Sequence, residues 1–209
     1  MIDRANSLAQ FSDALVERSA VANSAIAAVR LSGARHITAT AWRPDVAITS
    51  EQSLPGREEF ELETAGGSKI KAKTAGRDPG TNIAVLRLAQ RLSAGALVPV
   101  AARVGLLAIA FGADASGHAT VRLGAVNSVG PEWYSSHGGR IEQKVVLDIE
   151  LGRREEGGPV FDAAGGFLVG SLAVARTLTG FLFEITATDP VTYGSIAALL
   201  LVVAIVASF

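Results

Sequence analysis

The charged residues within positions 147–165 are the first candidates for chemistry in this chain. Residues 153–156, Arg-Arg-Glu-Glu, stand directly before Gly-Gly-Pro. A glycine pair permits backbone conformations and close approaches that a Cβ would forbid, and proline fixes φ as the chain re-enters an extended segment. In serine hydrolases the residue presented by such a turn is a Ser or Cys beside a base. Here it is Glu156, so the segment has the form of an active-site loop without its nucleophile. The structural alternative is a solvated charged turn between two strands.

Composition restricts the other kinds of site. The chain has no cysteine, which excludes disulfides and thiolate metal sites. Its histidines, His36, His118 and His137, form no metal-ligand pattern, so we expect neither a metal nor a cofactor. A net charge of −1 without a local Lys/Arg cluster argues against nucleic acid as a partner.

Short strand-like runs separated by turn residues predict an all-β chain. Residues 59–74 alternate polar and apolar side chains on both sides of Gly66-Gly67, which indicates a half-exposed hairpin. The 209 residues are 49% hydrophobic, enough to form the cores of two small β units. We place the first unit at 24–97 and the second at 98–189, with the loop-rich stretch 88–100 between them.

Each end of the chain is predicted to be helical. Residues 1–23 carry Leu8, Phe11 and Leu15 at helical spacing, and they are too polar for a secretory signal, so no signal peptide is expected and localisation stays open. Residues 190–209 carry no charge. Their strongly apolar run is short for a bilayer-spanning helix, which needs about 20 residues. A membrane, an oligomer contact or packing on the fold would each cover this segment.

Three stretches resemble the HtrA-like (Deg) branch of the trypsin-fold serine proteases. They are AWRPDVAITSEQSLPG at 41–56, AGRDPGTNIAVLRL at 75–88, and DIELGRREEGGPVFDAAGGFLVG at 148–170. In that family they carry the catalytic His, Asp and Ser in this order, and the resemblance extends over about residues 11–191. It implies a trypsin-like double six-stranded β-barrel with short N-terminal and C-terminal helices, the two β units being the two barrels.

Carried over residue by residue, the resemblance implies that the catalytic triad is lost. The general-base His falls on Gln52, the orienting Asp on Asn82 and the nucleophilic Ser on Glu156. A Gln amide is not a base near pH 7, an Asn cannot stabilise an imidazolium, and a carboxylate cannot form the Ser-type acyl-enzyme. The oxyanion-loop positions are altered too, since Arg154 aligns with a glycine whose amide is a donor in the family, and Glu155 follows it. We therefore expect no catalytic residue.

The expected function is that of a catalytically inactive serine protease homologue, a pseudoprotease, which binds a peptide or protein partner in the former substrate cleft. Two alternatives stay open. One is an active trypsin-like endopeptidase that uses displaced residues such as Ser50, Ser53 or Asp78. The other is a scaffold for assembly that is tethered to a membrane through residues 190–209.

A metal site at the same loops is a further alternative. Carboxylate and amide oxygens of Glu155, Glu156, Gln52 and Asn82 would suit Ca²⁺ or Mg²⁺. They follow no spacing motif, however. We expect instead a hydrogen-bonded polar cluster in which Arg153 or Arg154 holds Glu156.

Overall fold

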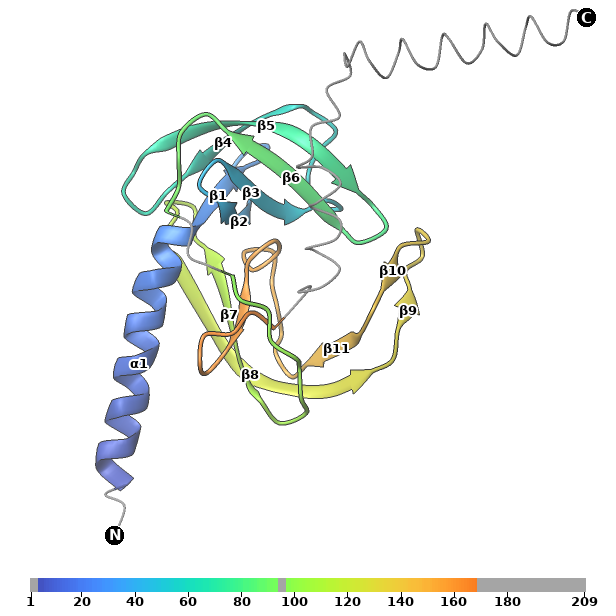
Figure 1. Ribbon diagram of the computed structural model, residues 1–209. Helices are drawn as coiled ribbons and strands as arrows, with labels where there is room; N and C mark the ends of the chain where they lie inside the picture. Colours follow the sequence, from blue (N-terminus) through green and yellow to red (C-terminus); the bar gives the residue numbers. More distant parts are fainter. Residues whose placement is uncertain (1–3, 94–96, 169–209) are drawn as a thin grey trace, which may run out of the picture.

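The computed structural model describes residues 4–93 and 97–168 (Figure 1). Its first element is the helix α1 (Arg4–Ala25), which leads directly into the first strand, β1 (Ile26–Arg30). The rest of the described chain is made of strands and turns, as the sequence predicts. In the described part of the chain, no helix is long and apolar enough to cross a membrane.

Six strands of the first unit form a closed antiparallel barrel in the order β1-β2-β3-β6-β5-β4. The five that follow β1 are β2 (His36–Arg43), β3 (Val46–Ser50), β4 (Glu59–Glu63), β5 (Lys69–Asp78) and β6 (Ile83–Leu88). The predicted hairpin is β4–β5, in which Leu62 pairs with Ile70 and Gly67 takes a φ of 73° in the turn. Closure of the barrel leaves β1 and β4 paired, so the first unit is a barrel rather than a sandwich.

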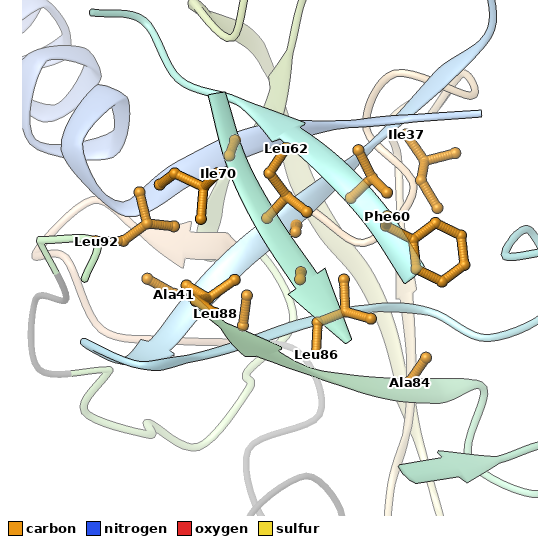
Figure 2. Packing of buried hydrophobic residues seen from close by; sticks show 14 of the residues in the cluster. Ile37, Ala41, Phe60, Leu62, Ile70, Ala84, Leu86, Leu88 and Leu92 are labelled. Carbon is orange, nitrogen blue, oxygen red and sulfur yellow. The ribbon is translucent and has the colours of Figure 1, made fainter. Parts of the chain in front are cut away.

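The barrel interior is filled by alternate residues of its strands (Figure 2). Ile37, Leu62 and Leu86 are almost fully buried, and Phe60 and Leu92 also belong to this cluster. Because β3 and β6 also bury their outward-facing residues, these two strands are nearly continuous apolar runs. That pattern is expected where both faces of a sheet are covered.

The second unit is a four-stranded antiparallel sheet in the order β11-β8-β7-β12. Its strands are β7 (Leu107–Ala113), β8 (Ala119–Gly130), β11 (Lys144–Leu147) and β12 (Val160–Asp162), and a small hairpin of β9 (Trp133–Tyr134) and β10 (Arg140–Ile141) extends from it. Val98 and Val100 already hydrogen-bond to Phe167, so the chain joins the second unit from there. The further strands predicted for a second barrel, and the predicted C-terminal helix at 190–209, lie outside the described residues.

Helix α1 packs on the second sheet although it precedes the first barrel in the sequence. Leu15 and Ala22 pack with Ile109 and Phe111 of β7, and Nη2 of Arg18 donates to the carbonyl of Ala164 at 2.8 Å. The C-terminal half of the helix therefore packs on the second unit, and its last residue connects directly to β1 of the first. Leu8 is 72% exposed and Phe11 41%, because the N-terminal half of α1 extends past the sheet (Figure 1).

Candidate functional site

The loop that follows β3, residues 51–57, is held by Arg77, which belongs to the Gly-Arg-Asp-Pro motif at 76–79 in the second family-like stretch. Nη1 of Arg77 donates to the carbonyl of Leu54 at 3.1 Å and lies 3.4 Å from Oε1 of Glu51. Asp78 fixes the next turn by accepting from the amide of Gly80 at 2.9 Å and from the hydroxyl of Thr81 at 2.6 Å. This motif thus positions two of the three loops that form the site.

Asn82 lies at the end of that turn, immediately before β6. Its φ is 57°, a left-handed conformation that Asn tolerates better than most residues, and no other non-glycine residue in the described part of the chain has a positive φ. Its side-chain oxygen accepts from the backbone N–H of Gln52 at 2.8 Å and from the hydroxyl of Ser50 at 3.1 Å. Asn82 therefore orders the backbone that carries Gln52, while the Gln52 side chain is exposed.

Glu156 joins this pair from the second unit. The hydroxyl of Ser53 donates to its Oε2, across 103 residues of sequence. The structure thus brings the three sequence-predicted positions together through two links. Asn82 bonds to Gln52, and the residue after Gln52 bonds to Glu156.

Buried threonines of the first barrel hold the loop that carries Glu156. The amide of Thr38 donates to the carbonyl of Glu156 at 2.9 Å, and the Thr38 hydroxyl donates to the carbonyl of Arg154. The hydroxyl of Thr40 donates to the carbonyl of Gly157 at 2.9 Å. These threonines alternate with apolar residues in ITATAW at 37–42, and that alternation is the signal in the sequence that could have found them.

Gly157 shows how closely the loop approaches the first barrel. Its φ is 82°, and a Cβ there would lie 2.1 Å from the carbonyl oxygen of Thr38 and 2.5 Å from the hydroxyl of Thr49. Gly158 is similarly close to β7, since its Cβ would lie 1.9 Å from the carbonyl oxygen of Phe111. The Gly-Gly pair is therefore required because the loop is wedged between the two units.

Glu155 is buried and turned inward. Its Oε1 lies 3.0 Å from Nε of Arg122 in β8, and its Oε2 accepts from the amide of Gly152 at 2.8 Å. The expected cluster, in which Arg153 or Arg154 holds Glu156, is therefore wrong. Ser53 holds Glu156, and the arginine that does pair with a glutamate of this loop comes from a distant strand.

The backbone around Arg154 differs from an open oxyanion hole. In Ser-type sites the amide of the nucleophile is one of the donors that stabilise the oxyanion. Here the amide of Glu156 donates to the carbonyl of Arg153 at 3.3 Å. One of the two donor positions is thereby committed within the loop itself.

A second contact between the units lies beside Asn82. The β9–β10 hairpin extends from the second sheet toward the turn between β5 and β6 (Figure 1). Its Gly139 lies against Gly80, so close that a Cβ on Gly139 would be 2.2 Å from the Gly80 carbonyl. Trp133 and Tyr134 of the same hairpin are 40% and 64% exposed.

Three of the four side chains considered for a metal, all except Gln52, have oxygen atoms in other contacts. Glu155 pairs with Arg122 and accepts from the Gly152 amide. Glu156 accepts from the Ser53 hydroxyl, and the side-chain oxygen of Asn82 accepts from the backbone N–H of Gln52. Residues 4–93 and 97–168 contain no group of three or more His, Cys, Asp or Glu side chains placed to hold a metal ion.

Comparison with known proteins gives one family and several solved structures. The trypsin-like peptidase domain matches residues 26–170. Deg5 superposes with a TM-score of 0.62 at 20% identity, covering 75% of this chain and 82% of Deg5. The MamO protease domain from Magnetospirillum magneticum gives 0.59 at 20%, covering 70% and 82%. The HtrA-type protease AlgW with a tripeptide gives 0.60 at 20%, covering 75% and 52%. No curated protein matches the sequence.

Proposed function

This chain belongs to the trypsin-like peptidase domain family, and we propose that it is a member that binds a peptide or protein partner without cleaving it. The proposal rests on the side chains that the three linked loops carry. They present two amides and a carboxylate, Gln52, Asn82 and Glu156, where a Ser-His-Asp relay would need a base and a nucleophile. No imidazole or thiolate is available in this cluster to take their place.

The maintained loop geometry supports binding rather than loss of all function. Asn82 still orders the backbone of Gln52, the threonines of β2 still hold the loop at 154–157, and both glycines of the Gly-Gly pair fit spaces that admit no Cβ. A surface built from three loops on two rigid units is well suited to hold an extended peptide.

The test combines cleavage with binding. Purified protein is incubated with casein and with fluorogenic peptides, and the same preparation is titrated into a labelled peptide pool followed by fluorescence anisotropy. We expect saturable binding and no turnover above that of a Glu156→Ala variant. Turnover that disappears in Glu156→Ala but persists through removal of contaminating proteases would overturn the proposal.

A second candidate function is supported by the bond between Ser53 and Glu156. A hydroxyl donating to a carboxylate has the arrangement of a nucleophile and its general base, with the two roles exchanged between the units. Glu156 would take the Ser53 proton while the Ser53 oxygen attacks an acyl carbon, and it would return that proton to the leaving group as the bond between the acyl carbon and the leaving group breaks. A carboxylate is a weaker base than an imidazole for activating a hydroxyl, and the Glu156 amide donates to the Arg153 carbonyl, so we rank this candidate second.

The two candidates differ in one covalent step. An active Ser53 should be labelled by a fluorophosphonate, and Ser53→Ala should abolish the labelling. Under the binding proposal neither the wild-type protein nor Ser53→Ala is labelled at Ser53, as judged by mass spectrometry of the digested protein.

A further inference from the structure

In the loop at 152–158 the acidic side chains bond within the protein, whereas the basic side chains are exposed. The Glu155 side chain is 3% exposed and paired with Arg122, and the Glu156 carboxylate accepts from Ser53. Arg153 and Arg154 are both exposed, and within the described part of the chain neither guanidinium has a hydrogen-bond or ion-pair partner. The carboxylates of Arg-Arg-Glu-Glu are thus used internally, while both cations face outward.

The backbone beneath these arginines is fixed. The carbonyl of Arg154 accepts from Thr38 of β2, and the carbonyl of Arg153 accepts from the Glu156 amide at 3.3 Å. On the side of β7 the loop rests on Gly112, where a Cβ would lie 2.6 Å from the Arg154 carbonyl oxygen. A partner would therefore have to order only the two side chains, which lowers the entropy lost on binding.

We propose that Arg153 and Arg154 recognise an acidic segment of a peptide partner, pairing its side-chain carboxylates with their guanidinium groups. This inference rests on the proposed function and names the chemistry of its ligand. A guanidinium offers a planar fork of donors that matches a carboxylate, so the carboxylate is the complementary group for both positions.

The acidic residues that precede Arg153 restrict where a bound peptide can carry its own acidic residues. Asp148 and Glu150 are exposed in the same segment, and the backbone at Asp148 lies against Gly124 of β8. Leu151, 46% exposed, separates them from the arginines. A partner with carboxylates along its whole length would meet like charge at Asp148 and Glu150, so the acidic residues must be confined to the part that lies over Arg153 and Arg154.

The experiment uses a short fluorescein-labelled peptide in which one half carries glutamates and the other half carries alanine and serine. The matched probe replaces each glutamate with glutamine. Binding to the full chain is measured by anisotropy at low and high ionic strength. Arg153→Gln and Arg154→Gln are compared with Arg103→Gln, which changes another exposed arginine of the second unit.

We expect the glutamate probe to bind more tightly than the glutamine probe. Because exposed ion pairs contribute about 0.2–1 kcal/mol each, each single variant should weaken binding about threefold and the double variant about tenfold. Arg103→Gln should leave binding unchanged, and the advantage of the glutamate probe should shrink at high ionic strength. Circular dichroism and thermal unfolding confirm that the variants stay folded.

The outcomes separate this inference from the proposed function. Peptide binding stands if both probes or the pooled peptides bind. The arginine inference is then overturned if the glutamate probe binds no more tightly than the glutamine probe, or if Arg103→Gln weakens binding as much as Arg154→Gln. If neither probe nor the pool binds the wild-type protein, the proposed function itself fails and the inference fails with it.

Discussion

The side-chain oxygen of Asn82 accepts the backbone N–H of Gln52 at 2.8 Å. Together with the bond from the Ser50 hydroxyl to the same oxygen, this bond holds the loop after β3 against the start of β6. An Asn can make it as well as an Asp, because only an acceptor is needed. The backbone arrangement of the site therefore needs an acceptor at position 82 but no charge. Replacing Asn82 therefore tests how much this bond contributes to the stability of the protein.

Replacing Asn82 with Ala should destabilise the protein by about 2–4 kcal/mol. The change removes the bonds to Gln52 and Ser50, each contributing about 0.5–1.5 kcal/mol, and leaves an alanine at a φ of 57°. Urea denaturation measures the difference. Asn127→Ala, at an exposed position in β8, should cost less than about 0.5 kcal/mol, and an equal loss in both variants would contradict the role given to Asn82.

Gly157 should be intolerant of even the smallest side chain. In Gly157→Ala the new Cβ would clash with the Thr38 carbonyl and the Thr49 hydroxyl, and the loop would have to leave the barrel. Gly33→Ala is the matched control, since Gly33 also has a positive φ, 65°, but no atom lies within 4 Å of its Cβ position. We expect a loss of about 1–2 kcal/mol for Gly33→Ala and at least about 3 kcal/mol for Gly157→Ala, measured by thermal or urea unfolding.

The ion pair between the buried Glu155 and the half-exposed Arg122 should be coupled. Removing the Arg122 guanidinium leaves a carboxylate that is 3% exposed with only the Gly152 amide as its donor, so Arg122→Ala should be clearly destabilising. Adding Glu155→Gln should recover part of the loss, because the uncompensated charge disappears. A double-mutant cycle in urea measures this coupling, and strictly additive losses would show that the pair contributes nothing.

Restoring the triad should not restore proteolysis by itself. The variant Gln52→His, Asn82→Asp, Glu156→Ser would supply the relay, but the amide of residue 156 is still bonded to the Arg153 carbonyl. Arg154 also still stands where the family resemblance implies a glycine. Because removing one oxyanion donor costs about 10²–10³ in turnover, cleavage of a fluorogenic peptide should rise by at least about 10²-fold when Arg154→Gly is added. Robust cleavage by the triple variant alone would show that the oxyanion hole is intact.

The apolar segment at 190–209 lies outside the described residues, and its role stays a prediction. Full-length protein is fractionated beside a version that ends at Asp189, and both are sized by gel filtration. Association with the membrane pellet or a larger assembly, lost in the shortened version, is the expected result. If both versions remain in the high-speed supernatant without detergent and elute as monomers, both the membrane anchor and the oligomer contact are excluded.

Local patterns in the sequence predicted much of the fold. The alternation at 59–74 predicted the β4–β5 hairpin, and the three family-like stretches placed Gln52, Asn82 and Glu156 in neighbouring loops. These features depend on residues close together in the chain or on a recognisable motif. They needed no knowledge of how the two units face each other.

The contacts that hold the site could not be predicted in the same way. The pairs Ser53 with Glu156, Thr38 with Arg154 and Arg122 with Glu155 join residues from distant parts of the chain. In the sequence Arg-Arg-Glu-Glu the nearest opposite charges are adjacent, which favoured a pairing within the loop. The loop at 152–158 instead lies between the two units, where both glutamates bond to other segments. This arrangement depends on how the loop packs against β2, β7 and β8.

The central claim is that the protein holds peptides and leaves them intact. The most direct measurement incubates the purified full-length chain with a peptide library and analyses both retained and released peptides by mass spectrometry, beside Ser53→Ala and Glu156→Ala. We predict that the wild-type protein retains a subset of peptides at their full length and that no new termini appear. New termini that are produced by the wild-type protein and lost in Ser53→Ala or Glu156→Ala would contradict the account.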